Sequence, residues 1–247
     1  MIKNKDFIFG VHAVTEAIRS GKELDKVLIA RKTDGETLQE LFSLVREREI
    51  PFQFVPFEKL NKITRKNHQG IIAFISEITY YPFQELITRI YESGNDPLFL
   101  ILEGVSDVRN FGAIARSAEC LGFNGIVIPE KGAARINADA VKTSAGALMN
   151  LPVSRVKSLP NTIKNMNDYG IHVFGISEKT DKKIFHASLS GPLALLMGSE
   201  DKGISENLLY LCEDSFSIPM SGKTESLNVS VAASIAMYEV VRQRLKS

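Results

Sequence analysis

The sequence predicts an α/β protein whose C-terminal part is built around a parallel sheet. Segments with helical periodicity alternate with short apolar segments along most of the 247 residues. One of the latter, residues 98–102 (LFLIL), is apolar throughout, as expected of a strand that is covered on both faces. Strands that alternate with helices in this way form parallel sheets flanked by helices. The composition, 44% hydrophobic and 24% charged, is typical of a globular protein, and the length allows two domains.

Residues 1–78 are predicted to form a small α/β domain. Its expected elements, in order, are helix 12–19, strand 26–30, helix 36–49, strand 52–55, helix 57–63 and strand 70–75. Residues 79–96 contain a short amphipathic helix, and we interpret this stretch as a linker because Gly94, Asn95 and Pro97 mark a boundary. The second domain is therefore expected to cover residues 97–247.

A basic stretch without acidic residues lies at the end of the first domain. It carries four cations, Lys59, Lys62, Arg65 and Lys66. Such a patch can neutralise the phosphates of a nucleic acid. The alternative is an ordinary solvated helix face and loop. His68 and Gln69, which follow the patch, either contact bases or only cap the next strand.

The second domain is predicted to alternate strands and helices up to its C-terminus. The expected strands are 98–102, 125–128, 153–156, 172–176, 193–197 and 216–218, and the expected helices are 111–121, 138–149, 161–169, 205–212 and a last helix after Asn228. Ligands bind beyond the carboxyl ends of the strands in open parallel sheets. The loops that follow the strands are therefore the places to look for a site.

Three of these loops carry polar or glycine-rich sequences. The first ends in Asn110 and leads into a helix whose small residues surround one long cation, Arg116. In the second, Gly198 follows a strand directly, which allows a ligand to approach the main chain. The third runs into the last helix through residues that favour helix N-termini, among them Ser226 and Asn228. Two simpler interpretations stay open: Arg116 forms a structural ion pair, and the last helix only closes the domain.

Several classes of protein are disfavoured by what the sequence lacks. A formal net charge of +1 gives no global basic field, so any contact with nucleic acid must come from local patches. The glycines near residue 104 do not have the spacing of a dinucleotide fingerprint, and no phosphate loop or nucleophile elbow is present. The four histidines lie in unlike contexts without metal-ligand spacing, so we expect no metal.

Cysteine usage and the absence of long apolar segments indicate a cytoplasmic protein. Cys120 and Cys212 are too few for a disulfide framework, and their apolar helical contexts predict buried thiols. The N-terminal stretch does not read as a leader peptide, and no segment is long enough to span a membrane, so we expect no membrane partner.

Taken together, the three loops resemble a known family. In this order and at these separations, NFGAIARSAECLG, LLMGSEDKGIS and IPMSGKTESLNVSVAASIAMYE resemble the three motifs of the SpoU (TrmH-type) branch of the SPOUT RNA methyltransferases. In the first domain, FGVHAVTEAI and HQGIIA are similar to the small, ribosomal-protein-like substrate-binding domain of the ribosomal RNA guanosine 2′-O-methyltransferases of that family. The resemblance implies a deep trefoil knot in the C-terminal domain, a site for S-adenosylmethionine, ribosomal RNA as substrate and a homodimer whose active site draws on both subunits.

The resemblance also implies roles for individual residues. The positions that match the cofactor-binding ones are Gly198, Ile218 and Leu227, with Met197 and Met220 beside them. The positions that match the catalytic or substrate-ordering ones are Asn110, Arg116, Glu200, Ser226 and Asn228. One departure is the run DVRNFG, where the family often has a proline near Asn110.

The chemistry of ribose methylation suggests a role for Arg116. A ribose 2′-hydroxyl is a very poor acid, so the site must remove its proton or stabilise the alkoxide as it forms. A guanidinium is not deprotonated in proteins, so Arg116 is expected to stabilise charge or hold a phosphate rather than act as a base. Ser226 and Asn228 are then expected to hold the ribose or Arg116. The rival interpretations are a transfer RNA ribose methyltransferase, a noncatalytic RNA-binding protein of the same fold and an enzyme acting on a small molecule.

Overall fold

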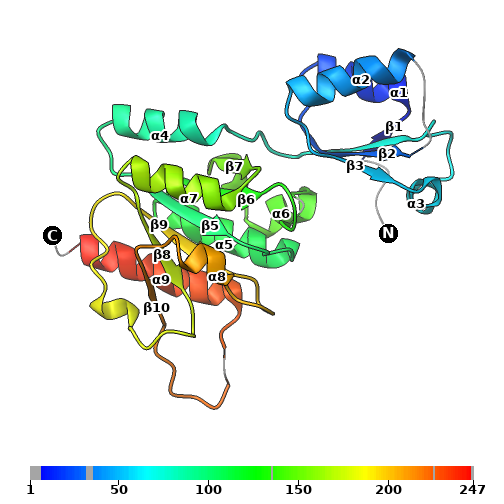
Figure 1. The fold of residues 1–247 in the computed structure, drawn as a ribbon. Helices are drawn as coiled ribbons and strands as arrows, with labels where there is room; N and C mark the ends of the chain where they lie inside the picture. The colour runs from blue at the N-terminus through cyan, green and yellow to red at the C-terminus, as the bar shows by residue number, and fades with distance from the viewer. Residues whose placement is uncertain (1–6, 32–35, 135, 225, 246–247) are drawn as a thin grey trace. The chain divides into compact units, whose positions relative to one another are not determined.

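The computed structural model describes residues 7–31, 36–134, 136–224 and 226–245 (Figure 1). The first six residues, part of the stretch examined for a leader, lie outside them. The chain divides into two compact units, the first ending at Thr79 and the second beginning at Tyr80. Each unit has its own hydrophobic core, so each is described by itself.

The first unit is a four-stranded sheet with helices on both faces. Its elements are β1 (Phe7–Phe9), α1 (Val11–Arg19), β2 (Leu24–Ala30), α2 (Glu36–Glu47), β3 (Phe52–Val55), α3 (Phe57–Ile63) and β4 (Ile71–Ile75). The strand order is β1-β4-β2-β3, with only β2 and β3 parallel. Alternate residues of the strands point to opposite faces of the sheet. On one face Val27 and Ile29 belong to a core shared with α1 and α2, and on the other Leu28 and Ala30 belong to a core shared with α3. The short strand β1 was not expected from the sequence.

His68 and Gln69 have structural roles in the loop before β4. The His68 ring is 2% exposed; its Nδ1 accepts from the Gly70 N–H at 3.1 Å and its Nε2 pairs with Asn61 Oδ1 at 3.0 Å. The Gln69 Oε1 accepts from the Val11 N–H at 3.2 Å. Of the two interpretations given to these residues, the structure favours the one in which they hold the start of the strand.

The second unit contains a six-stranded parallel sheet. Its elements are α4 (Phe83–Glu92), β5 (Leu98–Leu102), α5 (Val108–Cys120), β6 (Gly125–Pro129), α6 (Ala138–Thr143), η1 (Ala147–Met149), β7 (Val153–Val156), α7 (Leu159–Asp168), β8 (His172–Ile176), η2 (Ile184–His186), β9 (Leu193–Met197), α8 (Glu206–Leu209), β10 (Asp214–Phe216) and α9 (Val229–Arg244). The strand order is β10-β8-β9-β5-β6-β7, and every pairing between these strands is parallel. This confirms the predicted α/β class and parallel sheet.

Helices cover both faces of this sheet, as Figure 1 shows. Apolar residues of α4, α7 and α8 share one core with the inner strands, and α5 packs against α6 and α9. The stretch expected to be a linker therefore contains a docked helix, because Phe83, Leu86 and Ile87 of α4 are at most 4% exposed. An amphipathic pattern shows that one face of a helix is apolar, but not which surface it covers.

Other differences from the expected elements have local causes. The helix predicted over 138–149 is interrupted after α6 because Ala145 and Gly146 both have positive φ. The last strand lies two residues earlier than predicted, at Asp214–Phe216. The prediction of two buried thiols is wrong for Cys120, which is exposed in the last turn of α5. Cys212 is half-buried in the turn after α8, and burial raises the pKa of its thiol to about 12.

The setting of His68 predicts that the first unit loses stability in mild acid. Burial lowers the pKa of His68 below its ordinary value of 6.5. Its contribution is therefore complete above about pH 6.5 and is lost as the pH falls from there towards the folded-state pKa, because the unfolded chain binds the proton more tightly. Protonation also places a hydrogen on Nδ1, where the Gly70 N–H now donates.

A substitution separates this effect from that of other titrating groups. In His68→Asn the side-chain oxygen can still accept from Gly70, but the residue does not titrate. We expect hydrogen exchange of the peptide over Ile71–Ile75 to speed up less between pH 7.5 and pH 5.5 in this variant than in the wild type, after correction for intrinsic rates. An equal pH dependence in the two proteins would contradict the assignment.

Candidate functional site

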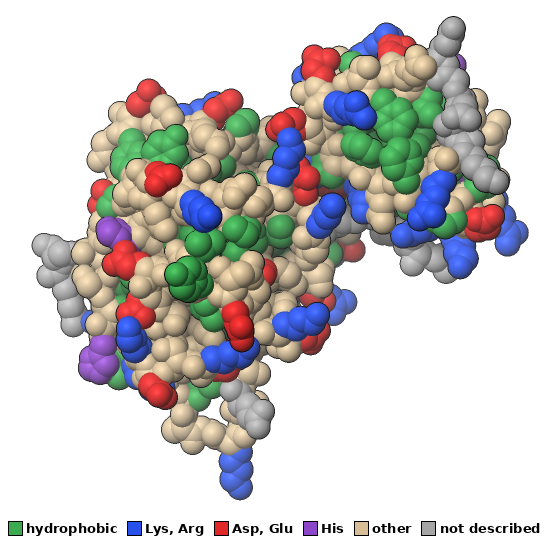
Figure 2. All heavy atoms as spheres, viewed as in Figure 1, with side chains coloured by type: hydrophobic (Ala, Val, Ile, Leu, Met, Phe, Trp, Pro, Cys, Tyr) green, Lys and Arg blue, Asp and Glu red, His purple; other side chains and the backbone are tan. Residues whose placement is uncertain are grey.

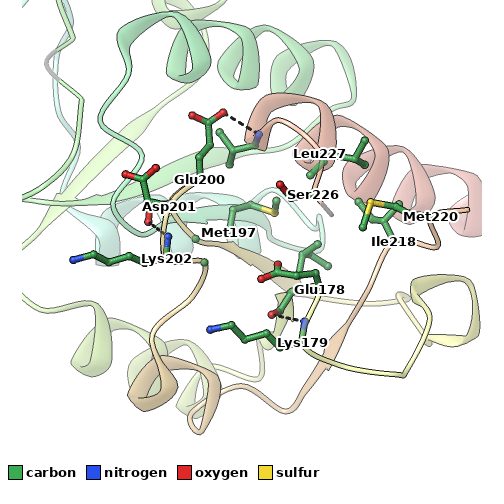
Figure 3. A pocket seen from close by; sticks show the side chains of 17 residues that line it. Glu178, Lys179, Met197, Glu200, Asp201, Lys202, Ile218, Met220, Ser226 and Leu227 are labelled. Atoms are coloured by element: carbon green, nitrogen blue, oxygen red, sulfur yellow. Dashed lines mark hydrogen bonds between the residues drawn. The ribbon is translucent and has the colours of Figure 1, made fainter. Parts of the chain in front are cut away.

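A pocket of the second unit lies beyond the carboxyl ends of its central strands (Figure 3). The strands end at one level, because Met197 is paired with both Leu102 and Ile176, and Ile176 is paired with Phe216. The loops that follow these strands are thereby brought together. The lining residues come from the end of β8 and the loop after it (176–179), from 197–203, from the segment before α9 (Ile218, Met220, Ser226 and Leu227) and from the first turn of α9 (Val229 and Ala232).

The loop after β9 folds back sharply on itself. The Gly203 N–H donates to the Ser199 carbonyl at 2.9 Å, and Gly203 has a φ of +66°. A Cβ on Gly198 would lie 2.0 Å from the carbonyl carbon of Gly203. The loop itself thus requires glycine at 198, whereas the sequence suggested that a ligand does. After the loop, the Glu103 carboxylate accepts from the Ser205 N–H at 2.8 Å.

Glu200 joins this loop to two helices. Its Oε1 accepts from Asn110 Nδ2 at 3.1 Å, from Asn228 Nδ2 at 2.5 Å and from the Val229 N–H at 3.4 Å. The two asparagines also contact each other, Asn228 Nδ2 donating to Asn110 Oδ1 at 3.1 Å. Three residues that are far apart in the sequence therefore form one hydrogen-bonded cluster beside the pocket. Figure 3 shows Glu200 at its rim, reaching towards the start of α9.

Each asparagine of the cluster is held by helix capping. Asn228 is the N-cap of α9, and its Oδ1 accepts from the Ser230 N–H at 3.0 Å. Asn110 lies in the first turn of α5, which begins at Val108, three residues before its predicted start at 111. Asp107 caps this turn by accepting from the N–H groups of Arg109 and Asn110, and these bonds lower the pKa of its carboxyl group. Capping thus fixes the side-chain amide of Asn228 and the backbone of Asn110.

Of the ten residues singled out in the sequence, seven line the pocket. These are the five expected at the cofactor, Met197, Gly198, Ile218, Met220 and Leu227, together with Glu200 and Ser226. Asn110 and Asn228 are tied to its rim through Glu200. Arg116 is not among the lining residues.

Arg116 is exposed on α5, six residues and about 9 Å along the helix axis from Asn110. Among the described residues it has no ion-pair partner, which gives no support to the alternative of a structural salt bridge. The adjacent Ser117 accepts a hydrogen bond from Ser234 of α9 at 2.8 Å. Arg116 thus lies beside the contact between α5 and α9.

Four charged lining residues were not singled out from the sequence: Glu178, Lys179, Asp201 and Lys202. The carboxyl-end rule points to Glu178 and Lys179, because they come directly after β8, but it does not say which of many loop residues face a pocket. In Figure 3 Glu178 lies within the pocket, and the ends of the two lysine side chains point away from it.

Within the described ranges, the side chains form no group of three or more His, Cys, Asp or Glu residues suited to a metal ion. No helix in the described part of the chain is long and apolar enough to cross a lipid bilayer.

Each of the two units matches a known protein family. Residues 97–238 match the SpoU rRNA Methylase family, and residues 7–81 match a family described as RNA 2′-O ribose methyltransferase substrate binding. The second match extends three residues beyond the domain end expected at 78. The trefoil knot that the resemblance implies stays a prediction.

Full-length relatives share this organisation. The chain is 35% identical over 244 residues to YacO of Bacillus subtilis, which is named as a member of the TrmH family of tRNA/rRNA methyltransferases, covering 99% of this chain and 98% of YacO. It is also 35% identical over 243 residues to the 23S rRNA (guanosine-2′-O-)-methyltransferase RlmB of Photobacterium profundum, with 98% and 99% covered.

Among solved structures, the SpoU methyltransferase AviRb of Streptomyces viridochromogenes in complex with AdoMet is similar. The TM-score is 0.63 and the identity 27%, with 98% of this chain and 91% of AviRb covered. These similarities confirm the resemblance found in the motifs: the chain belongs to the SpoU family of RNA methyltransferases.

Proposed function

We propose that this protein methylates the 2′-hydroxyl of a guanosine in 23S ribosomal RNA, with S-adenosylmethionine as methyl donor, in the cytoplasm. The observation that carries the proposal is that all five residues expected at the cofactor line one pocket, with the Glu200 cluster at its rim. Ribosomal RNA is favoured because the family that matches residues 97–238 is described as an rRNA methylase family, and RlmB is similar over 98% of this chain. Transfer RNA is the alternative, since the name of YacO covers both substrates.

The pocket has features that suit S-adenosylmethionine. Met197, Ile218 and Leu227 offer apolar contacts for an adenine ring, and the carboxylate of Glu178 suits a cationic or hydroxyl-bearing ligand. Within the described residues, the main-chain N–H groups of Ile218 and Leu227 have no hydrogen-bond partner, so they are available to a ligand. When bound, S-adenosylmethionine supplies a methyl group on a positively charged sulfur, which makes a metal unnecessary for its transfer.

The polar residues at the rim have separate tasks in this mechanism. Glu200 orients the amide groups of Asn110 and Asn228, because its Oε1 accepts from both. Ser226 and Asn228, at the start of α9, hold the ribose whose hydroxyl reacts. Arg116 stabilises the negative charge that develops on the 2′-oxygen or holds the neighbouring phosphate, since a guanidinium does not accept a proton.

This role for Arg116 requires a second subunit, because Arg116 does not line the pocket of its own chain. The surface of α9 supports a homodimer. Val231, Ile235 and Tyr238 recur at helical spacing and are 47%, 39% and 58% exposed, although they are large and apolar. A second copy that covers this stripe would bury it and lie next to Arg116, which is beside the α5–α9 contact. In the proposed dimer, each pocket receives the Arg116 of the partner.

Mapping of the modified nucleotide tests the proposed substrate. The purified protein is incubated with labelled S-adenosylmethionine and either ribosomal or transfer RNA from cells that lack the gene, and 2′-O-methyl positions are mapped. We expect one guanosine of 23S ribosomal RNA to be modified. Modification of transfer RNA would establish the alternative substrate, and methylation of neither RNA would indicate a noncatalytic protein.

A substitution at Leu227 tests the cofactor pocket. Leu227→Arg places a bulky cation in the lining, where we expect it to weaken binding of S-adenosylmethionine at least about tenfold by calorimetry. Leu227 is 37% exposed, so the melting temperature is expected to change little. The control is Leu245→Arg, the same change at an 81% exposed position outside the pocket lining. Equal affinities of the two variants for S-adenosylmethionine would show that the cofactor binds elsewhere. Gly198→Ala is not a clean test, because the added Cβ meets the backbone of Gly203.

Substitutions at Arg116 test catalysis and site sharing. Arg116→Ala is expected to lower single-turnover methyl transfer roughly a hundredfold or more with cofactor affinity unchanged, and Arg116→Lys to restore little, because an ammonium lacks the planar fork. An active alanine variant would remove Arg116 from the mechanism.

Mixed dimers decide whether the two subunits share each site. Arg116→Ala and Leu227→Arg chains are co-expressed in equal amounts. If each pocket uses the partner's arginine, one site in every mixed dimer is intact, and the preparation recovers about a quarter of wild-type activity. If both residues act within one chain, the mixture stays inactive.

A further inference from the structure

The surface over α3 in the first unit combines cations with an exposed aromatic ring. We call Phe57, Lys59, Lys62, Arg65 and Lys66 the α3 patch; all five are exposed. Within the described residues none of these cations forms an ion pair, and Glu58 is the one acidic residue between positions 56 and 70. Figure 2 shows Lys and Arg side chains gathered around this end of the first unit. The four cations outnumber this one acid, so the patch carries net positive charge.

The Phe57 ring is held in place although half of it is exposed. It is 50% exposed, and its centroid lies 4.7 Å from that of the His68 ring. His68 is itself buried and fixed by its hydrogen bonds to Asn61 and Gly70. A ring that is supported from one side loses little further conformational freedom when a ligand covers its free side.

The other exposed phenylalanines of this unit have a different setting. Phe52 and Phe54 of the edge strand β3 are 36% and 48% exposed, but they pack on each other and on Phe42 with centroids 5.7–5.9 Å apart. Phe52 and Phe54 are thus the partly exposed members of an aromatic cluster. Among the aromatic rings of the described residues, Phe57 contacts that of His68 alone. Because it also lies in a run of cations, it is the exposed ring that a polyanion would meet.

We propose that the α3 patch binds an unpaired segment of the substrate RNA, with one base stacked on Phe57 and the adjoining phosphates on the four cations. Stacking on aromatic rings within a positively charged surface is how proteins bind single-stranded nucleic acid. Residues 7–81 match a substrate-binding family, which favours RNA over an acidic protein as the occupant. The inference rests on the proposed function and adds to it that the first unit reads an unpaired base, beyond attracting phosphates.

The absence of tryptophan from the sequence allows a direct test. In Phe57→Trp the new ring is the sole tryptophan, and stacking of a base quenches its fluorescence. Phe54→Trp is the matched control, at an almost equally exposed phenylalanine outside the patch. Both full-length variants are titrated with a single-stranded RNA of about twelve nucleotides, with an abasic strand of the same length and with polyglutamate. Binding is followed in parallel by the anisotropy of labelled strands.

We expect the RNA to quench the tryptophan at 57 strongly and the one at 54 hardly at all. The abasic strand is expected to bind through its phosphates without strong quenching, and polyglutamate to leave the emission unchanged. Equal quenching at both positions, or by the abasic strand, would overturn the stacking contact. Quenching by polyglutamate as strong as by RNA would instead identify an acidic polypeptide as the ligand and overturn the proposal.

Affinity measurements supply a second criterion. Phe57→Leu keeps an apolar side chain but loses the flat ring, and we expect it to weaken single-stranded RNA binding about tenfold with the salt dependence unchanged. Phe57→Tyr should bind as the wild type does. Wild-type affinity in Phe57→Leu would overturn the inference. If ribosomal RNA is still methylated in that case, the proposed function stands; it fails separately if the wild type transfers no methyl group to RNA.

Discussion

The arrangement of the site depends on the hydrogen bonds that the Glu200 carboxylate accepts. Its Oε1 receives donors from the first turn of α5 and from the start of α9, while Glu200 itself is carried by the loop after β9. Three segments separated by up to 118 positions, the span from Asn110 to Asn228, are joined at one oxygen atom. Hydrogen bonds to a charged acceptor are stronger than those between neutral groups, so the cluster favours one arrangement of its two amide side chains.

This interaction depends in turn on a backbone constraint in the same loop. The contact between Gly198 and Gly203 leaves no space for a side chain and directs the chain from the buried strand β9 to the rim within a few residues. The Ser199 carbonyl accepts the Gly203 N–H and closes the turn, with Glu200 in its middle. The glycines therefore place Glu200, and Glu200 places the asparagines. The motif at residues 198–203 therefore shapes the loop as well as lining the pocket.

Much of the fold could be predicted from the sequence, because the patterns that determine its strands and helices are local. Strands such as β5 and β9 are continuous apolar runs, so their bounds were predicted correctly, and the last helix was predicted from its capping residues. The strand β1 was missed because three residues carry too little pattern, and it exists through its pairing with β4, more than sixty residues later. The break after α6 was missed because Ala145, ordinarily a good helix former, has a φ of 51°.

In the site, too, features set by local sequence could be predicted, whereas contacts between distant segments could not. The motifs indicated seven of the residues that line the pocket, because the motifs lie at or after the carboxyl ends of strands. They did not indicate that Glu200 contacts Asn110 and Asn228, because periodicity holds no information on contacts between loops. Likewise, the helical pattern around Arg116 could not show that this residue lies outside its own pocket. For His68 the sequence allowed a base contact, and only the fold shows that the ring is buried beneath Phe57.

In our proposal, the loops beyond β8, β9 and β10 form the cofactor pocket. Hydrogen exchange of the full-length protein, with and without S-adenosylhomocysteine, tests it most directly. We expect slower exchange in residues 176–179, 197–203 and 217–224, with little change around α3. Protection confined to other segments, such as residues 181–188 along a second cavity beside Asp214, with unchanged exchange in the three loops, would contradict this assignment.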